Sequence, residues 1–218
     1  MKLTSENINK IDNYLEENGI SYWDIRLEMI DHVACKMESK KGSYDFESLF
    51  KHTIHQLGWE KDLKAFEAHR LKTINKTIRK KYFKTTLELF TNFKSLVFIV
   101  LFSATYYFIL QDFSSKVFGI VTMIFLAVPV LGFTAHYAYT SIKLKKSVYL
   151  LYGYFYLTFS ILMTSLFYQL PRPGGVFEVS LITWYNMVFF TTIFNVLFIS
   201  SGIKVYLETH KQYNEVYR

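Results

Sequence analysis

Residues 69–94 read HRLKTINKTIRKKYFKTTLELFTNFK. This stretch holds eight Lys and Arg residues against the single acid Glu88, a net charge of +7. The residues before it, 1–68, carry nine cations and thirteen acids, a net charge of −4. After it, four long segments contain no Asp, Glu, Lys or Arg. The stretch therefore marks the point at which the chain passes from a water-soluble region into a membrane region.

The four uncharged segments are long enough to cross a bilayer. A hydrocarbon core of about 30 Å requires roughly 20 helical residues, and a charge at its centre costs on the order of 3 kcal/mol. Half of the chain (51%) is hydrophobic and 19% is aromatic, which is typical of a membrane protein. We therefore predict four transmembrane helices, over about 90–111, 117–141, 148–170 and 180–203.

The connections between these segments alternate in Lys and Arg content. Eight such residues precede the first span, three lie in 143–146 and three in 204–218, whereas 112–116 and 172–178 contain one each. Because cations accumulate on the cytoplasmic side of a membrane, both termini are expected in the cytoplasm. The N-terminus has no apolar core of the kind that a secretory signal requires, which agrees with this orientation.

Apolar residues in the soluble third recur at helical spacing. We predict helices over 5–17, over 21–38 with a capping box formed by Ser21 and Asp24, and over 45–57. A fourth helix begins near Glu60 and is expected to continue into the first span. The sequence thus predicts an all-α protein with both termini inside. Its parts are a small cytosolic helical bundle (1–68), a basic amphipathic connecting helix (69–94), a four-helix transmembrane bundle (95–203) and a cytosolic tail (204–218).

A pattern of polar residues in the soluble third resembles a known family. Glu28, Asp31-His32, a spacer through Gly42, the helix at 45–57 and its Leu57-Gly58 end are similar to the permease-prefix and HAAS-type signalling domains of bacterial membrane proteins. The resemblance covers about residues 8–70 and departs at Gly58-Trp59-Glu60, where that family has Gly-Asp-Pro. It implies an interaction or signalling domain without catalysis, located at the bacterial inner (cytoplasmic) membrane in a multi-pass protein.

Two residues of the second helix permit a catalytic alternative. Arg26 and His32 have the loose Arg-x(4 to 6)-His spacing of HEPN ribonucleases, in which such residues act on the RNA backbone. However, Leu27 follows Arg26 where that family prefers a polar residue. We therefore favour Arg26 as a surface ion-pair partner of Glu28 or Asp31, and we expect no catalytic residues.

Neither a metal nor another cofactor is expected. His32, Cys35, His52 and His55 have suggestive helical spacing, but they lack the tight Cys-x-x-Cys pairs that identify zinc sites. Cys35 is the only cysteine, so no intrachain disulfide can form.

The predicted spans contain few polar residues. His136 falls near the cytoplasmic end of the second span, where we expect it to anchor the helix at the interface. Asn186 and Asn195 are expected to form interhelical hydrogen bonds. Together with residues of the soluble third, they make up the candidate interaction or gating residues: Arg26, Glu28, Asp31, His32, His136, Asn186 and Asn195.

The basic residues beside the spans are expected to bind anionic lipid headgroups, at about 1 kcal/mol per cation. Nucleic acid is not an expected partner, because only Tyr82 and Phe83 interleave the charges with aromatic rings. The headgroup candidates are Arg70, Lys72, Lys76, Arg79, Lys80, Lys81, Lys84, Lys143, Lys145 and Lys146.

Two functions agree with this organisation. The first is a non-enzymatic inner-membrane protein whose cytosolic domain mediates signalling or contacts a cytosolic protein partner that the sequence does not identify. The alternative is an oligomeric pore or depolarising effector, or an accessory protein of a defence system such as type VI-B CRISPR, gated by the cytosolic domain. In either case we expect the chain to form a homo-oligomer.

Overall fold

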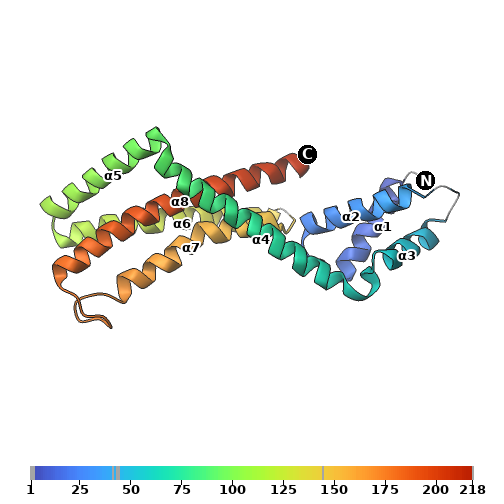
Figure 1. Cartoon of the computed structure of the whole chain (residues 1–218), viewed down its shortest axis with the longest axis horizontal. Coiled ribbons are helices and arrows are strands. Elements are labelled where there is room, and N and C mark those ends of the chain that lie inside the picture. The colour runs from blue at the N-terminus through green and yellow to red at the C-terminus, as the bar shows by residue number, and fades with distance from the viewer. Residues whose placement is uncertain (1–2, 41, 43–44, 144, 218) are drawn as a thin grey trace. The chain divides into compact units, whose positions relative to one another are not determined.

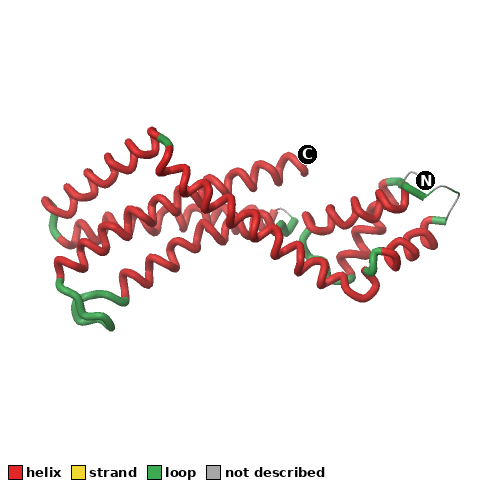
Figure 2. Tube along the Cα trace, in the orientation of Figure 1, coloured by secondary structure: helices red, strands yellow, loops and turns green. Residues whose placement is uncertain are grey.

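The computed structural model describes residues 3–40, 42, 45–143 and 145–217, and only the backbone of 61, 143, 160–169 and 216–217. Within this part of the chain every regular element is an α-helix, which confirms the predicted all-α class (Figure 2). The eight helices are α1 (Ser5–Glu17), α2 (Trp23–Glu38), α3 (Phe46–Gln56), α4 (Trp59–Thr91), α5 (Phe93–Asp112), α6 (Ser115–Lys143), α7 (Val148–Gln169) and α8 (Leu181–Tyr217) (Figure 1).

The chain divides into two compact units. One, which we call the N-terminal unit, contains Met1–Lys76 together with Ser141–Tyr149. The other, the bundle unit, contains Thr77–Thr140 and Leu150–Arg218. The N-terminal unit therefore includes the connection between α6 and α7, a segment more than sixty residues away from Lys76 in the sequence. Three helices, α4, α6 and α7, pass from one unit to the other.

Two helices of the N-terminal unit, α1 and α3, begin and end within one residue of the predicted bounds, whereas α2 begins at Trp23 instead of residue 21. Thr4 caps α1 by accepting a hydrogen bond from the Asn7 amide, and Asp45 caps α3 in the same way. Gly19 follows α1 with a φ of 91°, a conformation that glycine adopts without strain. The apolar face that helical periodicity predicts for α2 is buried: Ile25, Met29, Ile30, Val33 and Met37.

The fourth helix begins as predicted but ends earlier. It starts at Trp59, departs from helical geometry at Asp62 (φ −147°, ψ 38°) and stops at Thr91. Asn92 is extended (φ −87°, ψ 122°), and its side chain accepts a hydrogen bond from the Lys94 amide at 2.9 Å. The prediction of one helix running into the first span is therefore wrong, because Asn92 acts as an N-cap and starts α5 afresh. Figure 2 shows a short loop between these two helices.

Among the described residues, three helices are long and apolar enough to cross a membrane. They cover Phe93–Asp112, Ser115–Ile142 and Leu181–Glu215, and a shorter apolar stretch occupies Val148–Phe159 of α7. These lengths fit a multi-pass membrane protein. The number of four spans and the cytoplasmic position of both termini stay predictions.

Aromatic and small residues pack the bundle unit. Tyr106 of α5, Phe118 of α6 and Val188 of α8 form one buried cluster. Between α7 and α8, Gly202 lies so close to the backbone of Leu157 that an added Cβ would be 2.7 Å from its Cα. Small residues of this kind let membrane helices approach closely.

Candidate functional site

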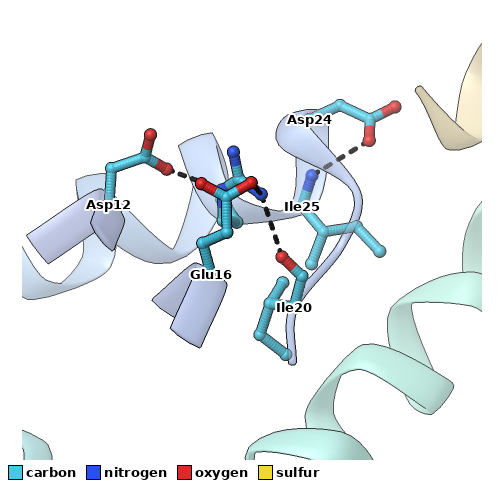
Figure 3. Close-up of polar contacts among 6 residues, drawn as sticks. Asp12, Glu16, Ile20, Asp24 and Ile25 are labelled. Atoms are coloured by element: carbon cyan, nitrogen blue, oxygen red, sulfur yellow. Dashed lines mark hydrogen bonds and ion pairs between the residues drawn. The ribbon is translucent and has the colours of Figure 1, made fainter. Parts of the chain in front are cut away.

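The corner between α1 and α2 is built around one buried guanidinium. Arg26 is only 3% exposed, and its Nε donates a hydrogen bond to Asp12 Oδ1 at 2.6 Å. Its Nη1 donates to Glu16 Oε1 and to the carbonyl of Ile20, both at 3.0 Å (Figure 3). Because Asp12 and Glu16 lie four residues apart on α1, both carboxylates reach the same guanidinium. The ion pairs therefore fix the start of α2 against α1.

The position of Arg26 corrects one interpretation of the sequence. Arg26 is not a surface residue that pairs with Glu28 or Asp31, because its guanidinium faces α1. His32 is exposed and lies about 120° further around α2. The structure thus separates the two residues whose spacing suggested a ribonuclease, and it uses one of them to join two helices.

Asp24 connects α2 to the start of α7. Its Oδ2 accepts hydrogen bonds from the Ser147 hydroxyl at 2.8 Å, the Val148 amide at 2.8 Å and the Tyr149 amide at 3.2 Å. Its Oδ1 accepts from the Ile25 amide at 3.1 Å (Figure 3). The first amides of a helix have no acceptor within the helix, so an outside carboxylate can satisfy them. Asp24 therefore acts as an N-cap for a helix that begins more than 120 residues later.

This arrangement also corrects the predicted capping box. The residue that precedes α2 is Tyr22, and its side chain makes no capping hydrogen bond. The Asp24 carboxylate, which the local pattern assigned to its own helix, instead serves mainly α7. The reason is that Ser147 and Val148 are buried beside it and that, with Tyr149, they offer three donors to one oxygen.

Further contacts hold the same segment. The Trp23 amide donates a hydrogen bond to the carbonyl of Lys146 at 2.9 Å. The Lys145 ammonium lies 5.9 Å from the centre of the Trp23 indole, within cation–π range. Backbone, carboxylate and aromatic groups at the start of α2 thus all contact residues 145–149, and we call this set the α2–α7 junction.

The electrostatics of the junction are set by burial. Desolvation raises the pKa of Asp24 above its usual value, and the four hydrogen bonds that the carboxylate accepts oppose this effect only in part.

One turn further along α2, Glu28 pairs with Arg70 of α4, whose Nη2 lies 2.6 and 2.7 Å from the two carboxylate oxygens. That hydrogen bond is the main cause that raises the pKa of Arg70. Glu28 thus joins α2 to α4.

The remaining candidates from the soluble third are not part of the junction. Asp31 and His32 are both exposed on α2, and the Asp31 carboxylate accepts only a weak hydrogen bond from the thiol of Cys35 at 3.8 Å. The four candidates of the N-terminal unit therefore do not form one site. Glu28 is the one of these four that pairs with a headgroup candidate, Arg70, among the described side chains.

The basic residues of α4 fall into two groups. Lys81 pairs with Glu208 of α8 at 2.9 Å, and Lys84 lies 4.0 Å from Glu88. Lys145 and Lys146 are exposed beside the junction, and the side chain of Lys143 lies outside the described residues. Among the headgroup candidates of α4, the exposed cations for which the described part of the chain shows no carboxylate partner are Lys72, Lys76, Arg79 and Lys80.

The polar residues of the bundle unit differ in environment. His136 of α6 is exposed, and its Nδ1 lies 2.9 Å from the hydroxyl of Tyr206 on α8. Asn186 is exposed, so it takes no part in the core. Asn195 is 2% exposed, yet neither atom of its amide has a partner among the described residues. The expected interhelical hydrogen bond of Asn195 is therefore not found in that part of the chain.

Sequence reasoning missed the residues that carry the junction. Trp23 and Asp24 lie more than 120 residues before Ser147 along the chain, so no local pattern links them to it. A usable signal was present at Ser147: an N-cap residue type directly before an apolar helix, whose capping partner could be sought elsewhere. Comparison with family models, curated proteins and solved structures found no match for this chain. The resemblance of its N-terminal region to permease-prefix and HAAS-type domains therefore stays a prediction.

Proposed function

We propose that this chain is a non-enzymatic, multi-pass membrane protein in which a cytosolic helical domain signals to a bundle of membrane helices. In this proposal the domain receives the signal by contact with a protein partner. The membrane is the cytoplasmic membrane of a bacterium, and both termini lie in the cytoplasm. The exposed cations of α4 contact anionic lipid headgroups.

The observation that carries this proposal is the capping of α7 by Asp24. The carboxylate belongs to α2, and the donors belong to the first residues of an apolar helix that continues into the bundle unit. A partner that shifts α2 would therefore change whether the first turn of α7 is capped. Loss of an N-cap costs about 1 kcal/mol, which is enough to change the population of two conformations about fivefold.

The burial of Arg26 in ion pairs supports the proposal that the protein is not an enzyme. A general acid or base must reach its substrate, whereas Arg26 is buried in ion pairs with Asp12 and Glu16. His32, its potential catalytic companion, is exposed and forms no hydrogen bond with Arg26 within the described part of the chain. The motif that suggested RNA cleavage is thereby explained as part of the helix packing.

One observation favours the alternative of an oligomeric pore. Small polar side chains follow the length of α8 inside the bundle unit, and all are buried: Thr192, Asn195, Ser201 and Thr209. Polar groups inside a membrane bundle occur in ion pathways. The amide of Asn195, which has no partner among the described residues, adds a group that water or an ion could satisfy.

Reconstitution of the full chain in liposomes separates the two functions. The signalling proposal expects no ion flux above that of empty liposomes, for the wild type and for Asp24→Ala. A pore expects flux, and flux that changes in Asp24→Ala would establish the alternative.

A cellular test addresses signalling itself. Whatever phenotype follows deletion of the gene should be rescued by the wild type and by Asp31→Ala, but not by Asp24→Ala at the same abundance in the membrane. Full rescue by Asp24→Ala would rule out signalling through the junction.

A further inference from the structure

A cavity of about 210 Å³ lies in the bundle unit where α4 ends and α5 begins, beside α8. Its wall is apolar and consists of Leu89, Phe98, Ile99 and Leu197. Its remaining lining is polar and consists of Lys94, Ser95 and Ser200. The cavity therefore combines an apolar surface with a cation and two hydroxyl groups, on residues of three different helices.

The cationic side of this cavity lacks a matching acid. Within the described part of the chain, no carboxylate lies at ion-pair distance from the ammonium of Lys94, which is exposed. Glu88, two turns earlier, is shared between Lys84 at 4.0 Å and Lys204 at 3.7 Å. Three lysines thus stand against one acid around the end of α4, an excess of two positive charges. An anion that binds here would find an uncompensated cation.

The position of the cavity along the chain matches the boundary of a membrane. Lys94 is the second residue of α5, the helix whose whole length qualifies as a membrane span. Phe98 and Ile99 follow one turn later on the same helix, and Leu197 lies within the apolar part of α8. Polar lining therefore sits at the start of the span and apolar wall further along it. A phospholipid has the same order of groups, a charged phosphate followed by acyl chains.

We propose that this cavity binds one anionic phospholipid. The phosphate contacts the ammonium of Lys94 and the hydroxyl of Ser95, which has no partner among the described residues. An acyl chain lies against Leu89, Phe98 and Leu197. Because the lining comes from α4, α5 and α8, the bound lipid would hold the α4–α5 bend against α8. This inference is independent of the function proposed above, because it requires only that the chain sits in a bilayer.

The test counts bound lipids on the purified full-length protein by native mass spectrometry. Phosphatidylglycerol and phosphatidylcholine with identical acyl chains are titrated separately against the wild type, Lys94→Gln and Lys116→Gln. The proposal expects the wild type to prefer phosphatidylglycerol and Lys94→Gln to lose about fivefold of that affinity, which corresponds to about 1 kcal/mol for one cation near a membrane surface. Lys116→Gln removes an exposed cation that is the second residue of α6, as Lys94 is of α5, but lies outside the cavity lining, and it should leave the first bound lipid unchanged.

A second variant tests the apolar wall. Leu197→Trp fills the cavity and should weaken both lipids, once circular dichroism and gel filtration show a folded, monodisperse protein. Excess inorganic phosphate should not displace phosphatidylglycerol. The proposal is overturned if Lys94→Gln binds phosphatidylglycerol within twofold of the wild type, if Lys116→Gln loses as much affinity, or if phosphate competes. If Leu197→Trp does not fold, the comparison of the two lysine variants still tests whether the cavity binds the lipid phosphate.

Discussion

Replacing Asp24 by alanine removes the acceptor at the α2–α7 junction and leaves its donors in place. In the wild type one oxygen accepts hydrogen bonds from the Ser147 hydroxyl and from the amides of Val148 and Tyr149. Val148 is 0% exposed and Ser147 is 7% exposed, so water has little room to replace the lost carboxylate. The first turn of α7 should therefore open more often in this variant.

The size of the effect follows from the bonds that are lost. A hydrogen bond to a charged group contributes about 1.5–3 kcal/mol, and an N-cap about 1 kcal/mol. The three bonds share one oxygen and are not additive, and Asp24 itself is partly exposed. We therefore expect a loss of about 2–3 kcal/mol in the free energy of opening this turn. Since 1.36 kcal/mol corresponds to a factor of ten, hydrogen exchange should become about 30- to 160-fold faster.

Hydrogen–deuterium exchange with mass spectrometry, on protein in lipid nanodiscs, measures this change at the amides of Val148 and Tyr149. Asp31→Ala is the matched control, because it removes an exposed carboxylate from the same helix. It should exchange like the wild type at residues 148–149. Equal exchange of Asp24→Ala and the wild type at these two amides would refute the capping role.

Three more predictions concern single residues. Because burial raises the pKa of Asp24 above its value in the unfolded chain, the wild type should gain unfolding free energy relative to Asp24→Asn as the pH falls from about 7 to about 4, and parallel thermal-unfolding profiles would contradict this. Gly202→Ala should lower the thermal stability in detergent by about 1–3 kcal/mol because its Cβ meets backbone, whereas Gly132→Ala meets nothing within 4 Å and serves as the control. Arg26→Ala should lower the unfolding free energy of the N-terminal unit by about 2–4 kcal/mol, because it leaves Asp12 and Glu16 without their buried partner, and limited proteolysis should become faster. His32→Ala should lower it by less than about 0.5 kcal/mol. Similar losses in both variants would argue for a shared functional role.

Local patterns predicted the helices of the N-terminal unit well. The first predicted helix, 5–17, coincides with α1, and the predicted 45–57 differs from α3 by one residue at each end. Both are amphipathic, and both are bounded by a capping side chain before and a glycine after. Such signals lie within a few residues of the helix they delimit, so a single sequence contains them.

Contacts between distant segments could not be predicted in the same way. Asp24 fits a capping box in its own helix, and no residue near it in the sequence indicates that its carboxylate accepts hydrogen bonds from the amides of α7. Arg26 follows the acids of α1 by ten and fourteen residues, a separation that helical spacing within α2 does not cover. Charged residues have several possible partners in a sequence, and only packing decides among them.

The break between α4 and α5 at Asn92 was missed for a different reason. The basic stretch and the first span both favour helix, so continuity was the simplest expectation. Asn is a preferred N-cap residue, and its side chain satisfies the Lys94 amide at the start of α5. The cue was present at a single residue, but the helical tendency on both sides masked it.

The length of α8 has a mechanical consequence. Its 37 residues extend over about 55 Å, whereas the hydrocarbon core is about 30 Å thick. The first charged residue of α8 is Lys204, so the length that exceeds the hydrocarbon core lies at the C-terminal end of the helix. This end forms an arm of about 20 Å that is continuous with the apolar part of α8. A tilt of about 10° in the span would swing the tip of this lever by about 3–4 Å. Lys81 holds the arm at Glu208, so such a swing would pull directly on α4.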